Sequence, residues 1–338
     1  MFKTYFASGS LIAFFLITLP ASLPAQLLKS PPLLTTEDFA IKQKNATLSF
    51  GFTGSDSITN TPIKLILEYK NNTPSVRVVL EGTWPTWLSN DLQDKCICVQ
   101  SEISTQWIFD TRKIEPTSIA KKSDPNRAAT IFTSLAYHAS HPHIKTVTDL
   151  ATIIADKQGL IYSGAGLSAS KVLTIEGLLK LLSFNLQKGF IETTAKAIEA
   201  SQDLINLMQP FFESCINGEP TDAHYALKDI CIYKNWGLLT ENLDLLHQAT
   251  GIDPLTPQSD TWLKDNVTLE ELQKIAYVLV IGQSCDNSGF LGWYRSVNPE
   301  GVIVSFDLAQ PPYLGPDDIF IKGDIQKTVL ELKNKLID

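Results

Sequence analysis

The stretch of residues 236–251, with the sequence WGLLTENLDLLHQATG, constrains the fold most. A short apolar run ends in a polar group that contains Thr240, Glu241, Asn242 and Asp244, and an apolar pair then leads to Gly251. This pattern predicts a buried strand that ends in polar side chains, followed by a short helix that the glycine closes. Ligands of open parallel sheets bind at such carboxyl ends of strands. The polar residues could equally be helix caps, which Asn and Asp often are.

The length and composition fit a globular protein of one large domain or two ordinary ones. The chain has 338 residues, of which 44% are hydrophobic, and this is enough apolar side chain to form a core. The formal net charge is -8 and the pI is about 5.2. Because such a chain has no general attraction to polyanions, we expect no nucleic-acid partner and no binding to anionic membranes.

The five cysteines are scattered and odd in number: Cys96, Cys98, Cys215, Cys231 and Cys285. No C-x-x-C pair occurs, which excludes a zinc site built from two such pairs. Cys96 and Cys98 alternate with an apolar residue and are interpreted as neighbours on one face of a strand. One or two disulfides are possible if the protein is exported.

Residues 1–25 have the pattern of a secretory signal peptide. They contain a lysine near the start, then a compact apolar run, then small residues. The apolar run is short for a membrane-spanning helix, and an uncleaved N-terminal anchor is the alternative. The mature chain is therefore predicted to be soluble, secreted or periplasmic, and free of membrane contact after signal removal.

Residues 27–118 alternate short apolar and polar runs with Asn, Gly and Pro between them, which is typical of antiparallel strands and turns. We predict a small β-rich domain of unknown role. Trp84, Trp87 and Trp107 are interpreted as core aromatics, with a ligand platform as the alternative. Residues 119–145 are predicted to be a linker.

Three histidines, His138, His141 and His143, lie close together in this linker. Imidazoles can ligate a metal, but Pro142 bends the segment and no carboxylate or thiolate completes a familiar spacing. We interpret the histidines as part of a solvated loop, and no metal site is predicted.

Residues 146–338 alternate helical and apolar stretches. Val147, Leu150 and Ile154 have helical spacing and predict a helix that Thr146 caps and Gly159 ends. The remaining elements are helices within 172–235, at 269–275 and at 325–336, and strands at 160–163, 237–240, 276–281, 301–307 and 318–324. Strands separated by helices predict an α/β fold with a doubly wound parallel sheet of the Rossmann-like type.

Several of these strands end in residues that suit a nucleotide. Gly164-Ala165-Gly166 follows the strand at 160–163, and glycines let backbone N–H groups approach a phosphate closely. Gly282-Gln283-Ser284 follows the strand at 276–281. Asp307 ends the next strand, where its carboxylate could accept hydrogen bonds from ribose hydroxyls or face water.

Residues 240–251 resemble the sirtuin signature T-Q-N-I-D-x-L-H-x-x-A-G. Six of its nine specified positions are identical: Thr240, Asn242, Asp244, Leu246, His247 and Gly251. The G-A-G-L-S of residues 164–168 resembles the family's G-A-G-I-S, residues 220–227 resemble its P-x-x-A-H-x-A-L element, and residues 282–284 resemble its G-T-S turn. The resemblance covers about residues 146–336.

The resemblance implies a Sir2-like domain with NAD as cofactor, and with NAD, ADP-ribose and a protein substrate or partner as ligands. It implies catalytic roles for Asn242 and Asp244, and a structural role for His224. The residues that it implies for cofactor binding are Gly164, Ala165, Gly166, Ser168, Thr240, Glu241, Asn242, Asp244, Gly282, Gln283, Ser284 and Asp307.

The sequence also departs from the family. Residues 172–177 read V-L-T-I-E-G where sirtuins have the G-I-P-D-F-R segment that lines the nicotinamide pocket. No histidine follows His247, so the family's general base is missing, and the four-cysteine zinc module is absent. Glu241 or Asp260 could replace the base if burial raised its pKa.

Three functions are consistent with these patterns. The first is an enzyme that breaks the nicotinamide–ribose bond of NAD by deacylation, ADP-ribosyl transfer or hydrolysis. The second is a degenerate sirtuin-like module, a pseudoenzyme that binds NAD, ADP-ribose or a protein partner without turnover. The third is an exported structural protein whose α/β domain has lost its ligand.

Overall fold

The computed structural model describes residues 12–17, 27–55, 60–70, 73–85, 88, 90, 93, 96–100, 105–110, 142–172, 201–256, 267–286 and 288–337. The chain divides into two compact units, each of which is described by itself. The first comprises Met1–Thr18, Thr47–Ser134 and Ile175–Phe212, and the second comprises Leu19–Ala46, Leu135–Thr174 and Glu213–Asp338.

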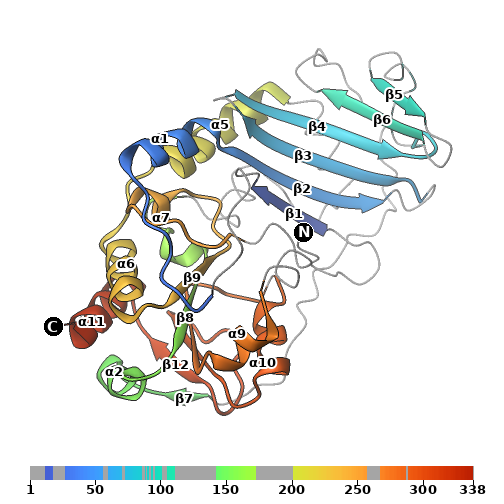
Figure 1. Ribbon diagram of the computed structural model, residues 1–338. Coiled ribbons are helices and arrows are strands. Elements are labelled where there is room, and N and C mark those ends of the chain that lie inside the picture. The colour runs from blue at the N-terminus through green and yellow to red at the C-terminus, as the bar shows by residue number, and fades with distance from the viewer. Residues whose placement is uncertain are drawn as a thin grey trace. The chain divides into compact units, whose positions relative to one another are not determined.

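The first unit contains an antiparallel sheet with the strand order β1-β2-β3-β4-β6-β5 (Figure 1). Its strands are β1 (Ile12–Ile17), β2 (Thr47–Ser55), β3 (Pro62–Lys70), β4 (Thr73–Glu81), β5 (Ile97–Gln100) and β6 (Thr105–Asp110). Alternate residues of β3 are buried, and the Tyr69 ring stacks on Phe212 of helix α5 (Ser201–Asn217) at 5.1 Å. The predicted β-rich domain is confirmed as a sheet.

Two sequence predictions concern parts of this unit. Residues 12–17, from the predicted signal peptide, form β1 and pair with β2. The signal peptide and the export that it implies stay predictions. Trp84 and Trp107 meet edge to face at 5.2 Å, and each indole N–H donates to a backbone carbonyl. Trp87 lies outside the described residues.

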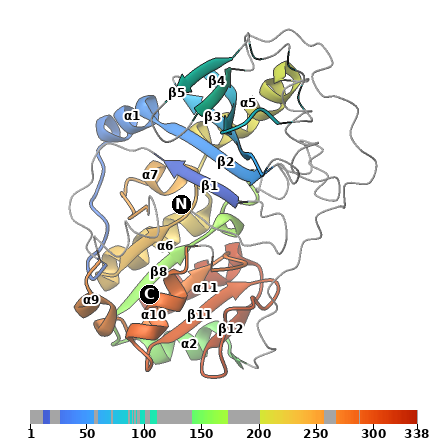
Figure 2. The same ribbon diagram turned by 90° about the vertical axis from the view of Figure 1, so that its right-hand side faces the viewer.

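The second unit is built on a parallel sheet with the strand order β7-β12-β11-β10-β8-β9. Its strands are β7 (His143–Ile144), β8 (Gly159–Ser163), β9 (Gly237–Thr240), β10 (Tyr277–Ile281), β11 (Val302–Asp307) and β12 (Ile319–Lys322). Every neighbouring pair is parallel, as the arrows of β8, β11 and β12 illustrate in Figure 2. The predicted doubly wound parallel sheet is confirmed.

Helices cover both faces of this sheet, which is why its central strands are apolar on both sides. On one face α2 (Val147–Ile154), α6 (Asp222–Lys234) and α11 (Ile325–Ile337) bury one hydrophobic core. On the other face α9 (Leu269–Lys274) and α10 (Phe290–Val297) bury a second core (Figure 1). All five residues of β8 are buried.

The strand order reverses at β8, and this fixes where a ligand can be recognised. The chain passes from β8 to β9 on one side and then crosses to β10 on the other side. Open α/β sheets bind ligands outside the carboxyl ends of the strands at such a topological switch point. The turns that follow β8, β9 and β10 therefore form the natural candidate site.

Some predicted boundaries differ from the structure. The helix predicted to end at Gly159 stops at Ile154, and Gly159 instead begins β8, with the Trp236 ring 2.8 Å from where a Cβ would lie. Residues 36–45, expected to be β-rich, form helix α1 (Thr36–Asn45) because Thr35 and Asp38 make a capping box. The prediction of strands was wrong there.

The predicted linker and its histidines are described only in part. His143 lies in β7, whereas His138 and His141 lie outside the described residues. In the described part of the chain no three His, Cys, Asp or Glu side chains are placed to hold a metal, and all five cysteines are free thiols. No described helix has the length and apolarity needed to span a bilayer.

A strap of residues 27–34 belongs to the second unit, whereas the sequence placed it with the β-rich domain. Leu27 is fully buried in the core with Leu160 and Tyr162, and its carbonyl lies 2.2 Å from where a Cβ of Gly237 would be. Residues 252–255 run beside β9, and the strap pairs with them through Leu33. The strap thus covers an edge that would otherwise be open to other chains.

We predict that Leu27→Ala destabilises the α/β unit by about 2–5 kcal/mol, because it removes a fully buried side chain and leaves a cavity. Urea unfolding of the full chain measures the effect. Leu33→Ala is the matched control, since Leu33 is 69% exposed and should change stability by less than about 0.5 kcal/mol. Equal midpoints for the two variants would show that the strap adds nothing to the core.

Candidate functional site

The candidate site consists of three segments, residues 164–168 after β8, residues 240–244 after β9 and residues 282–284 after β10, which we call the switch-point turns. Backbone hydrogen bonds join the first and third of them. The N–H of Gly164 donates to Ile281 at 2.9 Å, and the N–H of Gly166 donates to Gly282 at 2.8 Å. The parallel pairing of β8 and β10 thus continues into their turns.

The glycines of these turns are required by the contact between them. A Cβ on Gly166 would lie 2.8 Å from the Cα and the carbonyl oxygen of Gly282. A Cβ on Gly282 would lie 2.6 Å from the backbone nitrogen of Leu167, and the φ of Gly282 is +66°, which favours glycine. Backbone atoms of the neighbouring turn therefore fill the space beside these glycines. From the sequence, a phosphate was expected in this space.

The turn after β9 sends consecutive side chains to opposite faces of the sheet. Glu241 contacts Tyr162 and Gln283, which lie on the α10 side. Asn242 contacts Ser168, which lies on the α6 side, close to His224. The site therefore has two polar clusters, one over each face.

The first cluster, on the α10 side, is made by Tyr162, Glu241, Gln283 and Ser288. The Tyr162 hydroxyl donates to the Glu241 carboxylate, and the Gln283 amide donates to the same carboxylate at 2.8 Å. Ser288 lies 3.0 Å from the Tyr162 hydroxyl and also bonds to Glu241. Burial raises the pKa of Glu241, and burial together with the neighbouring Glu241 raises the pKa of Tyr162. The cluster ties together the ends of three adjacent strands.

The second cluster, on the α6 side, centres on the hydroxyl of Ser168. The Asn242 amide donates to the Ser168 Oγ at 3.2 Å, and the His224 Nε2 lies 3.3 Å from the same oxygen. Ser168 also bonds to the carboxyl of Asp244, whose Oδ1 accepts the Leu246 N–H at 3.1 Å. Asp244 thus contacts the first residue of helix α7 (Leu246–Ala249), whose N-cap is Leu245.

The hydrogen bonds of His224 determine where its proton lies. Its Nδ1 accepts the backbone N–H of Thr221 at 3.2 Å, so Nε2 carries the hydrogen and donates to Ser168. Burial lowers the pKa of His224 to about 4. A neutral imidazole that donates to a serine cannot accept the serine's proton, which excludes a serine–histidine nucleophile here.

His247 is likewise held by contacts within the fold. Its Nε2 lies 2.9 Å from the Ser163 Oγ, and Ser163 donates its own hydrogen to Thr240 at 2.9 Å. The His247 ring is 1% exposed and meets the His224 ring edge to face at 5.0 Å. Burial and the neighbouring His224 lower the pKa of His247 well below its usual value. These contacts agree with the structural role expected for His224, and His247 is held in the same way.

On the α6 side, the buried Asn242 Oδ1 and His247 Nδ1 form no hydrogen bond with the described residues. The side chain of Asn242 is enclosed, with 5% of the residue exposed, and its Oδ1 forms no hydrogen bond with any described residue. An unpaired buried carbonyl costs about 1–3 kcal/mol, so such a group indicates a missing donor. Asp244 lies beside it, and burial raises the pKa of Asp244 to about 6.

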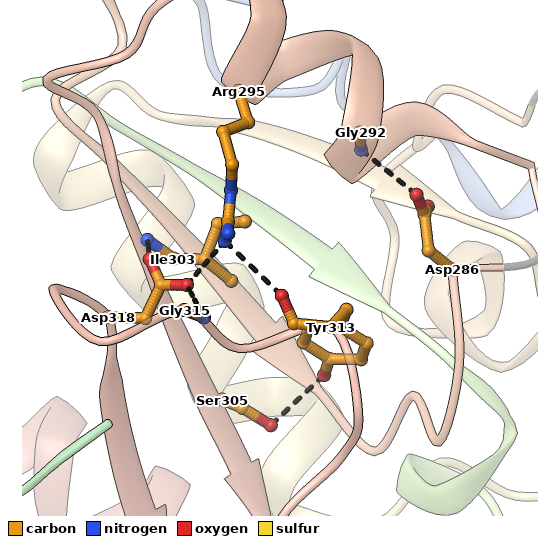
Figure 3. Close-up of polar contacts among 8 residues, drawn as sticks. All are labelled: Asp286, Gly292, Arg295, Ile303, Ser305, Tyr313, Gly315 and Asp318. Atoms are coloured by element: carbon orange, nitrogen blue, oxygen red, sulfur yellow. Dashed lines mark hydrogen bonds and ion pairs between the residues drawn. The ribbon is translucent and has the colours of Figure 1, made fainter. Parts of the chain in front are cut away.

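The loop between β11 and β12 fastens the third turn through Tyr313, whose contacts with Ser305 and Arg295 are drawn in Figure 3. The Tyr313 hydroxyl donates to the carbonyl of Gln283 at 2.9 Å and lies 3.0 Å from the Ser305 Oγ. Arg295 of α10 pairs with Asp318 and reaches the carbonyl of Tyr313 at 3.3 Å. Asp286 accepts the N–H of Gly292 at 2.9 Å and so caps α10.

The remaining expected site residues lie at the rim. Ser284 is exposed directly after Gln283, and Ala165 is exposed between the two glycines. Asp307 ends β11 and accepts the N–H of Leu308 at 2.6 Å. No described contact joins Asp307 to the two clusters. Four carboxylates, those of Glu241, Asp244, Asp286 and Asp307, lie in this region, and none forms a salt bridge with another described residue.

Sequence reasoning missed Tyr162, Ser288 and Asp286. Tyr162 lies in an apolar strand, where a tyrosine is usually interpreted as a residue that packs in the core. The signal available was its position directly before Ser163 and the glycine turn, which puts its hydroxyl near the strand end. Ser288 and Asp286 come from a segment without a recognised motif.

No protein-family model matches the chain, and no curated protein matches it. The chain is similar in structure to Sir2 homologues. One of them, solved as a complex with NAD, is 15% identical with a TM-score of 0.44, and the match covers 60% of this chain and 97% of that one. A mutant Sir2 homologue with ADP-ribose is 16% identical, with a TM-score of 0.44 and coverages of 56% and 95%. Sir2Tm bound to a propionylated peptide is 10% identical, with a TM-score of 0.42 and coverages of 56% and 98%. Such low identities say nothing about what this chain binds.

We predict that Gly166→Ala destabilises the protein by about 2 kcal/mol or more, because the new Cβ meets the backbone of Gly282, which cannot move aside easily. Gly292→Ala in α10 is the control. The nearest atom to its Cβ lies at an ordinary 3.6 Å, and alanine is the better helix former. Thermal unfolding compares the two, and equal melting temperatures would contradict the contact.

We predict that His224 makes the protein less stable in mild acid. Its pKa is about 4 in the fold and 6.5 in the unfolded chain, so below pH 6.5 the unfolded chain binds the extra proton. The stability from this group is complete above pH 6.5 and falls by about 3 kcal/mol as the pH drops to 4. The raised pKa of Asp244 acts in the opposite sense, so the variant His224→Gln is compared with the wild type.

The free energy of unfolding, measured in urea at pH 7 and pH 4.5, should fall more steeply for the wild type than for His224→Gln. His143→Gln on the exposed strand β7 should keep the wild-type slope. A variant slope equal to that of the wild type would mean that His224 is not neutral in the fold.

Proposed function

We propose that the α/β unit is a sirtuin-like nucleotide-binding domain that binds NAD or ADP-ribose at the switch-point turns. The observation that carries the proposal is the unpartnered carbonyl of Asn242, buried at the end of β9. It lies where open α/β sheets bind ligands. A ribose hydroxyl is a donor of the kind that this oxygen needs.

The neighbouring groups support a ribosyl ligand. Ser168 accepts the Asn242 amide and bonds to the carboxyl of Asp244, so the amide is held in place before a ligand arrives. Ala165 is exposed, and its N–H pairs with no backbone acceptor among the described residues. This group is available to a phosphate oxygen. The residues present therefore offer suitable hydrogen-bonding groups to the ribose of NAD and fewer such groups to its phosphates.

The same contacts limit the chemistry. NAD supplies a nicotinamide–ribose bond that can be broken with release of nicotinamide. Deacylation needs a group that takes a proton from a ribose hydroxyl near neutral pH. His224 and His247 are buried and neutral, and no histidine follows them in the sequence. Binding without deacylation is therefore the function that the geometry supports best.

Hydrolysis of NAD is the second candidate, and the carboxyl of Asp244 favours it. Its pKa of about 6 lets it exchange a proton near neutral pH, and it lies beside the amide that would hold the ribose. Water is a smaller acceptor than an acyl-lysine and needs fewer groups to orient it. Export, a protein substrate and a protein partner stay predictions.

We predict that Asn242→Ala weakens the binding of ADP-ribose to the full chain by about tenfold, since one buried hydrogen bond contributes about 1–1.5 kcal/mol. Isothermal titration measures the dissociation constant. Asn334→Ala, an exposed position on α11, is the control and should bind as the wild type does. Chromatography of NAD incubations then separates the candidates, because hydrolysis releases nicotinamide and binding alone does not. Unchanged affinity in Asn242→Ala would refute the proposed site.

A further inference from the structure

We propose that Gln283 determines which ligands the site accepts. Its side chain keeps a pyrophosphate away from Gly164. The resting site therefore favours a ribosyl nucleoside that carries no 5′-pyrophosphate over a dinucleotide. The inference rests on the proposed function, because it assigns the substrate class of the same site. A dinucleotide binds only after the Gln283 side chain has swung aside.

The side chain of Gln283 fills the space above Gly164. The Oε1 of Gln283 lies only 1.8 Å from where a Cβ of Gly164 would be. A glycine in a phosphate-binding turn is useful because this space stays open to the ligand. Here a neutral amide of the chain itself occupies it, and Gln283 is 4% exposed.

Hydrogen bonds hold both the side chain and the backbone of Gln283. Its amide donates to Glu241 at 2.8 Å and to the Tyr162 hydroxyl at 3.3 Å. Its backbone carbonyl accepts the hydroxyl of Tyr313 at 2.9 Å. The backbone is therefore fixed, and the side chain can leave Gly164 only by giving up its bonds to Glu241 and Tyr162.

The turn beneath Gln283 has few donors left for a phosphate. The N–H groups of Gly164, Gly166, Leu167 and Ser168 all donate to backbone carbonyls at 2.8–3.2 Å. Carboxylates of Glu241 and Asp286 lie nearby, and neither forms a salt bridge with another described residue. A pyrophosphate would thus meet like charge and amides that are already paired.

The ribose side of the site does not depend on Gln283. Asn242 and Ser168 lie on the α6 side, whereas Gln283 and Glu241 lie on the α10 side. The unpaired Asn242 carbonyl, which a nucleoside would contact, makes no described contact with Gln283. The ligand class that the resting site prefers is therefore a ribosyl nucleoside without a 5′-pyrophosphate, and NAD and ADP-ribose bind to the same site more weakly.

The test compares two ligands that share one ribosyl group. Isothermal titration of the full chain with nicotinamide riboside and with NAD gives the ratio of their dissociation constants. In the wild type we expect NAD to bind no more tightly than the riboside. Gln283→Ala empties the space above Gly164 and should improve the binding of NAD by about tenfold, with less than twofold change for the riboside.

One further variant distinguishes the effect of filling the space above Gly164 from the effect of the Gln283 hydrogen bonds, and a second variant is a control. Gln283→Met fills the space without the amide and should keep NAD binding weak. Gln273→Ala, an exposed glutamine on α9, should behave as the wild type does. If Gln283→Ala does not fold, as judged by its melting curve, Gln283→Ser opens the same space with a polar group.

The outcomes are distinct. Tight NAD binding to the wild type, or an unchanged NAD-to-riboside ratio in the opened variants, overturns the role of Gln283 while leaving the proposed binding site standing. Binding of neither ligand to any variant overturns the proposed function and this inference together.

Discussion

The close contact between the turns after β8 and β10 is the constraint on which the site depends. Gly166 and Gly282 touch through their backbones, and any side chain at either position would push the two strand ends apart. This contact fixes the spacing between the ends of β8 and β10. These strands lie at the switch point, where the order in which strands are added across the sheet changes direction. Because the turns are fixed, the side chains that follow them can be held by hydrogen bonds without mobile loops.

Those side chains form two networks with different consequences. On the α6 side, Ser168 and His224 are paired within the fold, whereas the Asn242 carbonyl and the His247 Nδ1 have no partner among the described residues. On the α10 side, Glu241 and Gln283 satisfy one another. Buried polar groups that are paired rigidify a structure, and an unpaired one costs stability unless something binds to it. Unpaired atoms of these networks thus lie on the α6 side, and the proposed ligand site rests on that of Asn242.

The sequence predicted the parallel sheet because its central strands are apolar on both faces and alternate with helices, and the polar residues after Thr240 marked the strand end correctly. It could not show that Gly164 and Gly166 serve a neighbouring turn, since a glycine accommodates backbone and phosphate equally well. The helix at 36–45 was missed although its Thr35–Asp38 capping box is a local signal, and the burial of Leu27 escaped because its core partners, such as Leu160 and Leu239, are distant in the sequence. Only the fold brings those partners together.

Glu241 and Gln283 replace the Gln and Thr that the sirtuin motifs have at these positions, and the structure links the two replacements. The Gln283 amide donates to the Glu241 carboxylate, which is enclosed by Tyr162 and Ser288 as well. A threonine at 283 would be too short to reach that carboxylate, and a buried carboxylate that loses a donor destabilises the fold. Each replacement therefore makes the other tolerable. The side chains of the α10-side cluster are all paired among the described residues, whereas Asn242 and His247 on the α6 side each keep an unpaired buried atom. The pairing of Glu241 with Gln283 is the feature on which the proposed exclusion of a pyrophosphate rests.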